Sequence, residues 1–184
     1  MWYYGQYAKD CKTYYGAIDI GSNAVRLLIK CVEEDEQGKV FFSKVLLLRV
    51  PLRLGFDVFA MGKISETKEK NMLRLMKVFH HLMKIYDVED YRACATSAMR
   101  DAKNGKDIIK RIKKKTGIRI EIIDGQEEAK MIYNNHIECM EDRNGNYMYV
   151  DVGGGSTEIN LLSQGELVAA VRTTSVQYVF WTMP

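Results

Sequence analysis

The sequence predicts a layered α/β fold. Three predicted strands come first, and strands and helices then alternate along the chain. A last run of three strands joined by turns closes the sequence. Short apolar segments bounded by glycine are typical of strands, whereas apolar residues spaced three and four apart are typical of helices.

The first half of the chain contains both patterns. Residues 1–13 are expected to form an irregular leader, and strands are predicted at 14–20, 24–34 and 44–50. A helix begins at Ser65, because apolar residues then recur at helical spacing, namely Met72, Leu75, Met76, Phe79, Leu82 and Met83.

Alternating elements follow this helix. Strands are predicted at 90–96 and 118–123, and helices at 104–116 and 125–140. Gly117 ends the first of these two helices. The closing strands are predicted at 147–152, 158–162 and 166–171.

Two strand–turn–strand units in the chain resemble each other. AIDIGSNAVRLLI (17–29) and YVDVGGGSTEINLL (149–162) each have an apolar strand ending in Asp-x-Gly, a few small polar residues and a second apolar strand. This internal similarity predicts two related domains that face one another. We expect the first at 14–140 and the start of the second at 141–174.

The two turns have the composition of phosphate-binding loops. Gly, Ser and Thr present backbone N–H groups and hydroxyls to an anion without a bulky side chain in the way. Asp19 and Asp151, at the strand ends, would repel phosphate unless a cation lay between, so together with Glu158 they predict bound Mg²⁺. Either turn alone also fits an ordinary hairpin, and neither fits a P-loop or a dinucleotide-binding glycine pattern.

Four segments resemble the motifs of the exopolyphosphatase/guanosine pentaphosphate phosphatase (Ppx/GppA) family, in the actin/hexokinase/Hsp70 ATPase superfamily. They are AIDIGSNAVRLLI, ATSAMRDAKNG, IEIIDGQEEAKMIY and YVDVGGGSTEINLL, and the resemblance covers roughly residues 14–170. It implies a ribonuclease-H-like domain, a mixed sheet with helices, followed by the opening strands of a second such domain. It also implies a cleft between the domains where Mg²⁺ assists hydrolysis of the terminal phosphate of polyphosphate or pppGpp.

The resemblance assigns roles to individual residues. Ser22 and Asn23 match the first phosphate loop, and Asp151 and Glu158 match the acidic residues beside the second. Arg100 matches an arginine that lines the family's cleft. The second phosphate loop is matched by Gly153, Gly154, Gly155, Ser156 and Thr157.

Glu128 matches the family's catalytic glutamate, and its position suits that role. Phosphoryl transfer needs charge neutralisation and an oriented water more than covalent chemistry. The planar fork of Arg100 suits phosphate oxygens, and Glu128 can orient the water or accept its proton. Without the resemblance, Glu127 and Glu128 would be ordinary acids in the first turn of a helix, where the dipole favours ionised carboxylates.

Composition, charge and cysteine content limit the kinds of partner and the cellular location that we expect for this protein. The chain has 184 residues, 47% of them hydrophobic, and a net charge of +3, which is too small to argue for nucleic acid or a membrane surface. The start of the chain has no signal-peptide pattern. The four cysteines form no CxxC pair, so we expect reduced thiols and a cytoplasmic protein. The full-length relatives are expected to be homodimers.

The end of the sequence departs from the family. After the GEL strand the family typically runs IGTVRF, whereas residues 175–180 are SVQYVF. Codons for the family string, read one base late, encode SVQYVF. We therefore expect a C-terminally truncated chain with an out-of-frame tail at 175–184, which puts its own activity in doubt.

Two other functions remain open at this stage. A small-molecule kinase of the same superfamily would use ATP and an adenosine pocket, although DGQEEA and SAMRDA argue against it. A non-enzymatic domain would bind nucleotide alarmones, or a partner, without turnover. Phosphate release from polyphosphate without a sugar acceptor distinguishes these functions from a phosphohydrolase.

Overall fold

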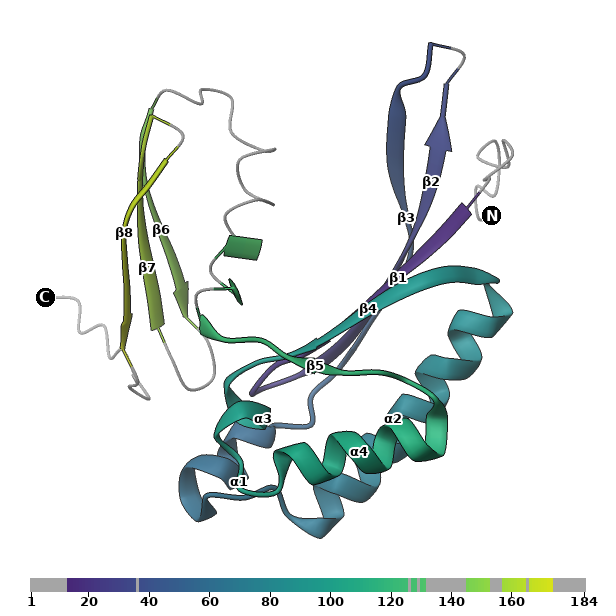
Figure 1. Ribbon diagram of the computed structural model, residues 1–184, viewed down its shortest axis with the longest axis vertical. Helices are drawn as coiled ribbons and strands as arrows, with labels where there is room; N and C mark the ends of the chain where they lie inside the picture. The colour runs from purple at the N-terminus through teal and green to yellow at the C-terminus, as the bar shows by residue number, and fades with distance from the viewer. Residues whose placement is uncertain are drawn as a thin grey trace, which may run out of the picture.

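Two β-sheets and four labelled helices make up the computed structural model (Figure 1). The structure describes residues 13–35, 37–125, 127–128, 130–131, 145–152, 157–164 and 166–173. The predicted tail at 175–184 and all of the predicted leader except Thr13 lie outside these residues. The domain boundaries predicted at 14–140 and 141–174 stay predictions.

The first sheet has five strands in the order β3-β2-β1-β4-β5. They are β1 (Thr13–Ile20), β2 (Val25–Glu34), β3 (Val40–Val50), β4 (Val88–Ala95) and β5 (Glu121–Ile122). Tight turns make β1, β2 and β3 antiparallel, whereas helical crossovers make β4 parallel to β1 and β5 parallel to β4. This mixed sheet confirms the predicted ribonuclease-H-like fold class.

The helices cover one face of this sheet (Figure 1). They are α1 (Leu54–Met61), α2 (Glu66–Ile85), α3 (Ser97–Asp101) and α4 (Gly105–Thr116). Ser65 caps α2 by accepting a hydrogen bond from the Lys68 amide, and Gly117 ends α4 with a φ of 78°. The predicted helix starting at Ser65 and the end at Gly117 are therefore confirmed.

The core lies between the sheet and these helices. Alternate residues of β1 and β2 point toward the helices and are buried, as are the methionines and the phenylalanine of the α2 stripe. Leu82 is only partly buried. The central side chains of the core are Ile18, Ile20, Leu27, Ile29, Met72, Met76, Phe79, Ile108 and Ile112.

Helices α1 and α3 were not predicted. Each is short, and α1 is apolar almost throughout, so neither shows a helical stripe. Asp57 in α1 accepts a hydrogen bond from the Ser65 amide and pairs with Lys68 at 2.6 Å, which joins α1 to the start of α2. Burial opposes ionisation of Asp57, but the bonds from Lys68 and Ser65 outweigh it and lower its pKa.

Two predicted elements differ in extent. The strand predicted at 118–123 is reduced to β5, because only Glu121 and Ile122 find partners on β4. The strand predicted at 44–50 begins earlier, at Val40, since β2 continues to pair with it. The described residues of 125–131 are helical, and the rest of the helix predicted to reach 140 lies outside the described residues.

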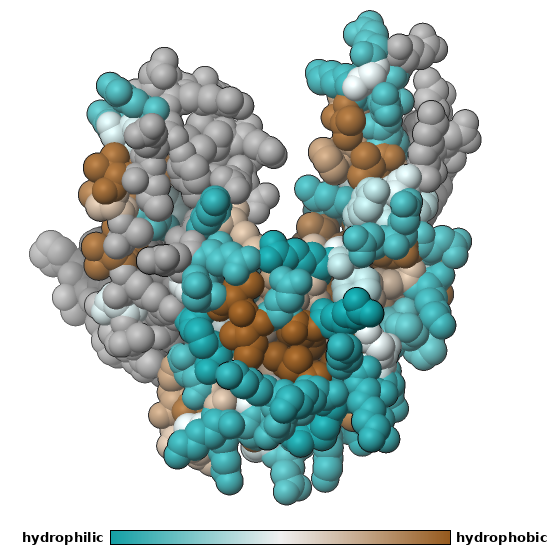
Figure 2. All heavy atoms as spheres, viewed as in Figure 1, coloured by the Kyte–Doolittle hydropathy of each residue, from teal (hydrophilic) through white to brown (hydrophobic). Residues whose placement is uncertain are grey.

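The second sheet is an antiparallel meander. It contains β6 (Asn146–Val152), β7 (Thr157–Ser163) and β8 (Glu166–Thr173) in that order. The three closing strands are thereby confirmed. Figure 2 shows apolar residues at the surface of this sheet, and the exposed ones include Met148, Val150, Leu161, Val168 and Val171.

Two further observations bear on the predictions about membranes and about the oxidation state of the cysteines. No helix among the described residues is long and apolar enough to cross a membrane. The expectation of four reduced thiols is wrong at Cys31, which is disulfide-bonded, whereas Cys94 is free. Scatter along a sequence does not show which thiols the fold brings together, and the other two cysteines lie outside the described residues.

Candidate functional site

A polar row crosses the face of the first sheet that points away from the helices. Strand register places Arg26 of β2 opposite Asp19 of β1, Asp19 opposite Cys94 of β4, and Cys94 opposite Glu121 of β5. Residues opposite each other in a sheet share a face. Since Ile18 and Ile20 point into the core, this row points the other way.

Asp19 is held by an ion pair in this row. Arg26 Nη1 lies 2.5 Å from Asp19 Oδ2, and both side chains are about half exposed. The predicted metal ligand is therefore already neutralised by a neighbouring cation. Its exposure still leaves room for other ligands on the second carboxylate oxygen.

The turn between β1 and β2 is anchored from behind. Ser22 is buried, and its Oγ lies 2.7 Å from the Oγ of Ser97 at the start of α3. The Gly55 amide donates to the Ser22 carbonyl at 2.8 Å, and the Arg53 amide donates to the Asn23 carbonyl at 2.7 Å. A Cβ at Gly55 would lie 2.9 Å from the Ser22 Cβ, so glycine allows α1 to approach this closely.

These contacts separate the two residues predicted for the first phosphate loop. The Ser22 hydroxyl faces Ser97 and fixes the turn, whereas the Asn23 side chain is exposed. Backbone N–H groups and Asn23 are then the groups that this turn presents outward. Whether they bind phosphate stays a prediction.

Arg100 connects α3 to the segment that carries Glu128. Its Nη1 donates to the carbonyl of Ile123 at 2.8 Å, and its side chain is mostly buried. The Ile123 amide donates in turn to the carbonyl of Ala95, at the end of β4. The structure thus brings Arg100 close to the chain entering the Glu128 turn.

Glu128 lies in the first turn of a helical segment that Asp124 caps. Asp124 Oδ1 accepts a hydrogen bond from the Glu127 amide at 2.8 Å, and the Asp124 carbonyl accepts one from the Glu128 amide at 3.0 Å. An aspartate at this position satisfies amides that have no partner within the helix. The Glu128 side chain is half-buried, and its Oε2 is shielded from solvent.

Glu127, the residue before Glu128, takes part in an ion-pair cluster with Arg92 and Glu121. Glu127 Oε1 accepts a hydrogen bond from Arg92 Nη2 at 2.7 Å, and Arg92 also donates to Glu121 at 3.0 and 3.2 Å. These bonds to Glu127 and then Glu121 raise the pKa of Arg92. Burial raises the pKa of the nearby Cys94 thiol, which lies opposite Glu121 in the sheet, although Arg92 opposes that effect.

The proposed magnesium ligands are only partly described. Asp151 of β6 pairs with Glu158 of β7 across the sheet, which places both residues beside the turn predicted to bind phosphate. Among the residues that the structure describes, no group of three or more Asp, Glu, His or Cys could hold a metal ion. Asp19 nevertheless fits Mg²⁺, which needs only one or two carboxylates and completes its shell with water.

The second phosphate loop lies mostly outside the description. Gly153, Gly154, Gly155 and Ser156 are not described, and Thr157 is the buried first residue of β7. Besides the Asp151–Glu158 pair, the predicted site residues that the structure connects lie in and around the first sheet. Ser22 reaches α3 through Ser97, and Arg100 reaches the Glu128 segment from α3.

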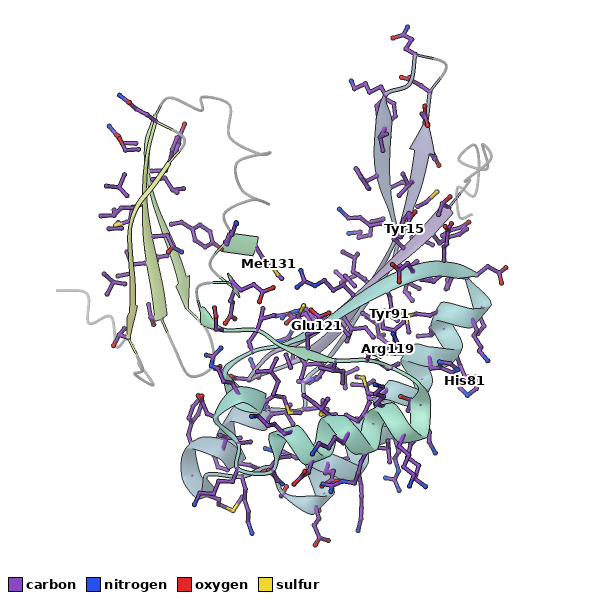
Figure 3. All side chains as sticks on the ribbon, viewed as in Figure 1. Tyr15, His81, Tyr91, Arg119, Glu121 and Met131 are labelled. Atoms are coloured by element: carbon purple, nitrogen blue, oxygen red, sulfur yellow. The ribbon has the colours of Figure 1, made fainter. Side chains whose placement is uncertain are left out.

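Sequence reasoning missed Ser97, Arg92 and Glu121. Figure 3 labels Glu121 on β5, close to the helical segment that contains Met131. Period-two alternation in the strand predicted at 90–96 could have placed Arg92 and Cys94 on one face. No pattern in the sequence shows that β5, with Glu121, pairs with β4 on the side of Arg92.

Known proteins resemble this chain in sequence. Exopolyphosphatase 1 of Mycobacterium tuberculosis is 28% identical over 145 residues, which cover 79% of this chain and 41% of that protein. Guanosine-5'-triphosphate,3'-diphosphate pyrophosphatase of Photobacterium profundum is 27% identical over 169 residues, covering 91% and 32%. The chain therefore spans less than half the length of these two relatives.

A solved structure shows the same fold. The crystal structure of an exopolyphosphatase from Cytophaga hutchinsonii superimposes with a TM-score of 0.78 at 26% identity, covering 88% of this chain and 50% of that one. Residues 31–175 match the Ppx/GppA phosphatase family. That match covers well over half of the sequence, and the chain belongs to the Ppx/GppA phosphatase family.

Proposed function

We propose that this chain provides part of a phosphohydrolase that releases the terminal phosphate of inorganic polyphosphate. One observation supports this most directly. Arg100 donates a hydrogen bond to the carbonyl of Ile123, the residue just before the turn that Asp124 caps and that carries Glu128. A cation and a carboxylate with one shielded oxygen therefore lie at the same end of the sheet. Family membership gives the reaction class.

Each group has a proposed role that fits its chemistry. Glu128 orients the attacking water or accepts its proton, and Arg100 neutralises charge on the transferred phosphoryl group. The backbone of 21–23, with Asn23, and the loop 153–157 hold the phosphates. Asp19, Asp151 and Glu158 would hold Mg²⁺, which when bound would neutralise phosphate charge.

Arg26 has a consequence for magnesium binding. The Arg26 guanidinium pairs with Asp19 Oδ2. To bind Mg²⁺, Asp19 would either use its other carboxylate oxygen or give up its ion pair with Arg26. We expect Arg26→Gln to alter the magnesium concentration needed for half-maximal activity.

Guanosine pentaphosphate is the second candidate substrate. A relative named for a guanosine phosphate aligns over most of this chain, and both substrates end in a phosphoanhydride. We propose one terminal-phosphate site for both, with substrate choice made by parts of the protein beyond this chain. A homodimeric full-length protein and a cytoplasmic location belong to the same proposal.

The test compares Glu128→Gln with the unchanged chain. Phosphate release from polyphosphate in the presence of Mg²⁺ is expected to fall by about 10²- to 10⁴-fold in kcat, because the variant cannot take a proton. Glu89→Gln, an exposed acid on β4, is the matched control and is expected to leave turnover unchanged. Turnover that survives Glu128→Gln would contradict the mechanism.

The same assay separates the rival functions. Transfer of phosphate from ATP to a small molecule, with no release from polyphosphate, would favour the kinase. Binding of polyphosphate or pppGpp by calorimetry without any turnover would favour the non-enzymatic domain, or a reaction that needs the further length that the relatives have.

A further inference from the structure

We propose that Arg92 is a positioning residue that fixes the turn carrying Glu128 by joining Glu121 to Glu127. The inference rests on the proposed role of Glu128. It concerns a residue of β4 that none of the recognised motifs contains. Arg92 acts through Glu127 and is not expected to touch the substrate.

The contacts form a bridge between two parts of the chain. Arg92 Nε and Nη2 lie 3.2 and 3.0 Å from Glu121 Oε2, and Nη2 lies 2.7 Å from Glu127 Oε1. Glu121 belongs to the sheet through β5, whereas Glu127 belongs to the turn. Arg92 therefore ties the turn to the rigid sheet beneath it.

Adjacent positions in a helix do not share a face. When Arg92 holds the Glu127 side chain toward the sheet, the Glu128 side chain must point in a different direction. Asp124 fixes the amides of the same turn from the N-terminal side, and Arg100 holds the preceding carbonyl of Ile123. Among the contacts found for the described residues of this turn, the Arg92 bridge is a further side-chain contact that can set the rotation of the turn.

The Arg92 ion pairs are too weak to stabilise the whole fold, which favours a local positioning role. The side chains of Arg92, Glu121 and Glu127 are 52%, 60% and 44% exposed, and each exposed ion pair shifts an equilibrium by about fivefold or less. Such pairs add little to the stability of the whole fold. They can, however, decide the population of a single helical turn.

Lysine is not equivalent to arginine at this position. The guanidinium has several donors in a fixed plane, which allows it to reach two carboxylates at once, whereas an ammonium is a single flexible point charge. Arg92→Lys should therefore preserve the charge and lose much of the bridge. Arg92→Gln should lose both.

Arg111 provides a matched control. It donates to Glu69 at 2.5 and 2.9 Å, with a similar exposure of 51%, and it joins α4 to α2 on the helical layer. Arg111→Gln removes an arginine–glutamate pair of the same kind between two helices, where neither partner contacts Arg92 or Glu127 in the hydrogen bonds found. It should leave the exchange of amides in that turn unchanged.

Amide hydrogen exchange on the full 184-residue chain tests the bridge without requiring activity. In Arg92→Gln we expect the amides of Glu127 and Glu128 to exchange about two- to fivefold faster, with α2 and α4 unchanged. Arg92→Lys should give an intermediate rate. Unchanged exchange in the turn, or equal acceleration in α2 and α4, overturns the proposal.

Turnover of polyphosphate tests the consequence for the reaction. We expect Arg92→Gln and Glu127→Gln each to lower kcat by about two- to fivefold with KM within twofold, and the double variant to be no worse than either. Unchanged kcat alongside faster exchange overturns a positioning role. If the unchanged chain releases no phosphate, the proposed function fails for this chain, and exchange alone decides whether Arg92 holds the turn.

Discussion

The two sheets contain similar apolar strands but differ in what covers them. Ile20 and Leu27 of the first sheet are fully buried beneath the helices. Met148 and Val171 of the second sheet are 67% and 61% exposed. Alternation in the sequence predicts an apolar face in both cases, but an apolar face is stabilising only when another layer removes it from water.

The helical layer also fixes the turn that joins β1 to β2. The turn between β1 and β2 is held by Ser97 and by the amides of Arg53 and Gly55, all of which lie in or next to the helical layer. The equivalent turn between β6 and β7 falls at residues 153–156, outside the described part. A phosphate loop needs a fixed backbone, so the layer behind the first turn would support the phosphate binding that we propose for it.

The largest expected effect concerns the covered sheet. Phe79→Ala should lower the free energy of unfolding by about 3–5 kcal/mol, because the ring is fully buried between α2 and the sheet and its removal leaves a cavity. Urea unfolding followed by circular dichroism measures the change. A loss below about 1 kcal/mol would show that this layer is not well packed.

A smaller effect is expected at the anchored turn. Ser97→Ala should cost about 1–3 kcal/mol, because it leaves the buried Ser22 hydroxyl without its partner. The double variant with Ser22→Ala should cost less than the sum of the two single changes, as expected for residues in contact. Additive losses in the same unfolding experiment would mean that the two hydroxyls do not interact.

The smallest effect is expected at an exposed side chain of the second sheet. Met148→Ser should change the free energy of unfolding by no more than about 0.5 kcal/mol, since the side chain is largely in water already. The same change should reduce self-association measured by light scattering, because exposed apolar patches promote it. A loss comparable with that of Phe79→Ala would mean that another layer covers this face in solution.

Much of the fold followed from local patterns. The α2 stripe, the stop at Gly117 and the strands β1, β2 and β6 to β8 each depend on residues close together in the chain. Helices α1 and α3 escaped prediction because short helices form through packing, with little periodicity of their own. The strand predicted at 118–123 was too long, since its extent depends on how far β4 runs beside it.

The sequence by itself determined the family, the fold class and the motifs with Arg100, Glu128 and the two glycine-containing turns, because these are short runs with characteristic order. Only the tertiary structure decided that Ser22 faces Ser97 and that Arg92 joins Glu121 to Glu127. Such contacts join residues 75, 29 and 35 positions apart. They depend on strand order and register, which are set by how all the layers pack together.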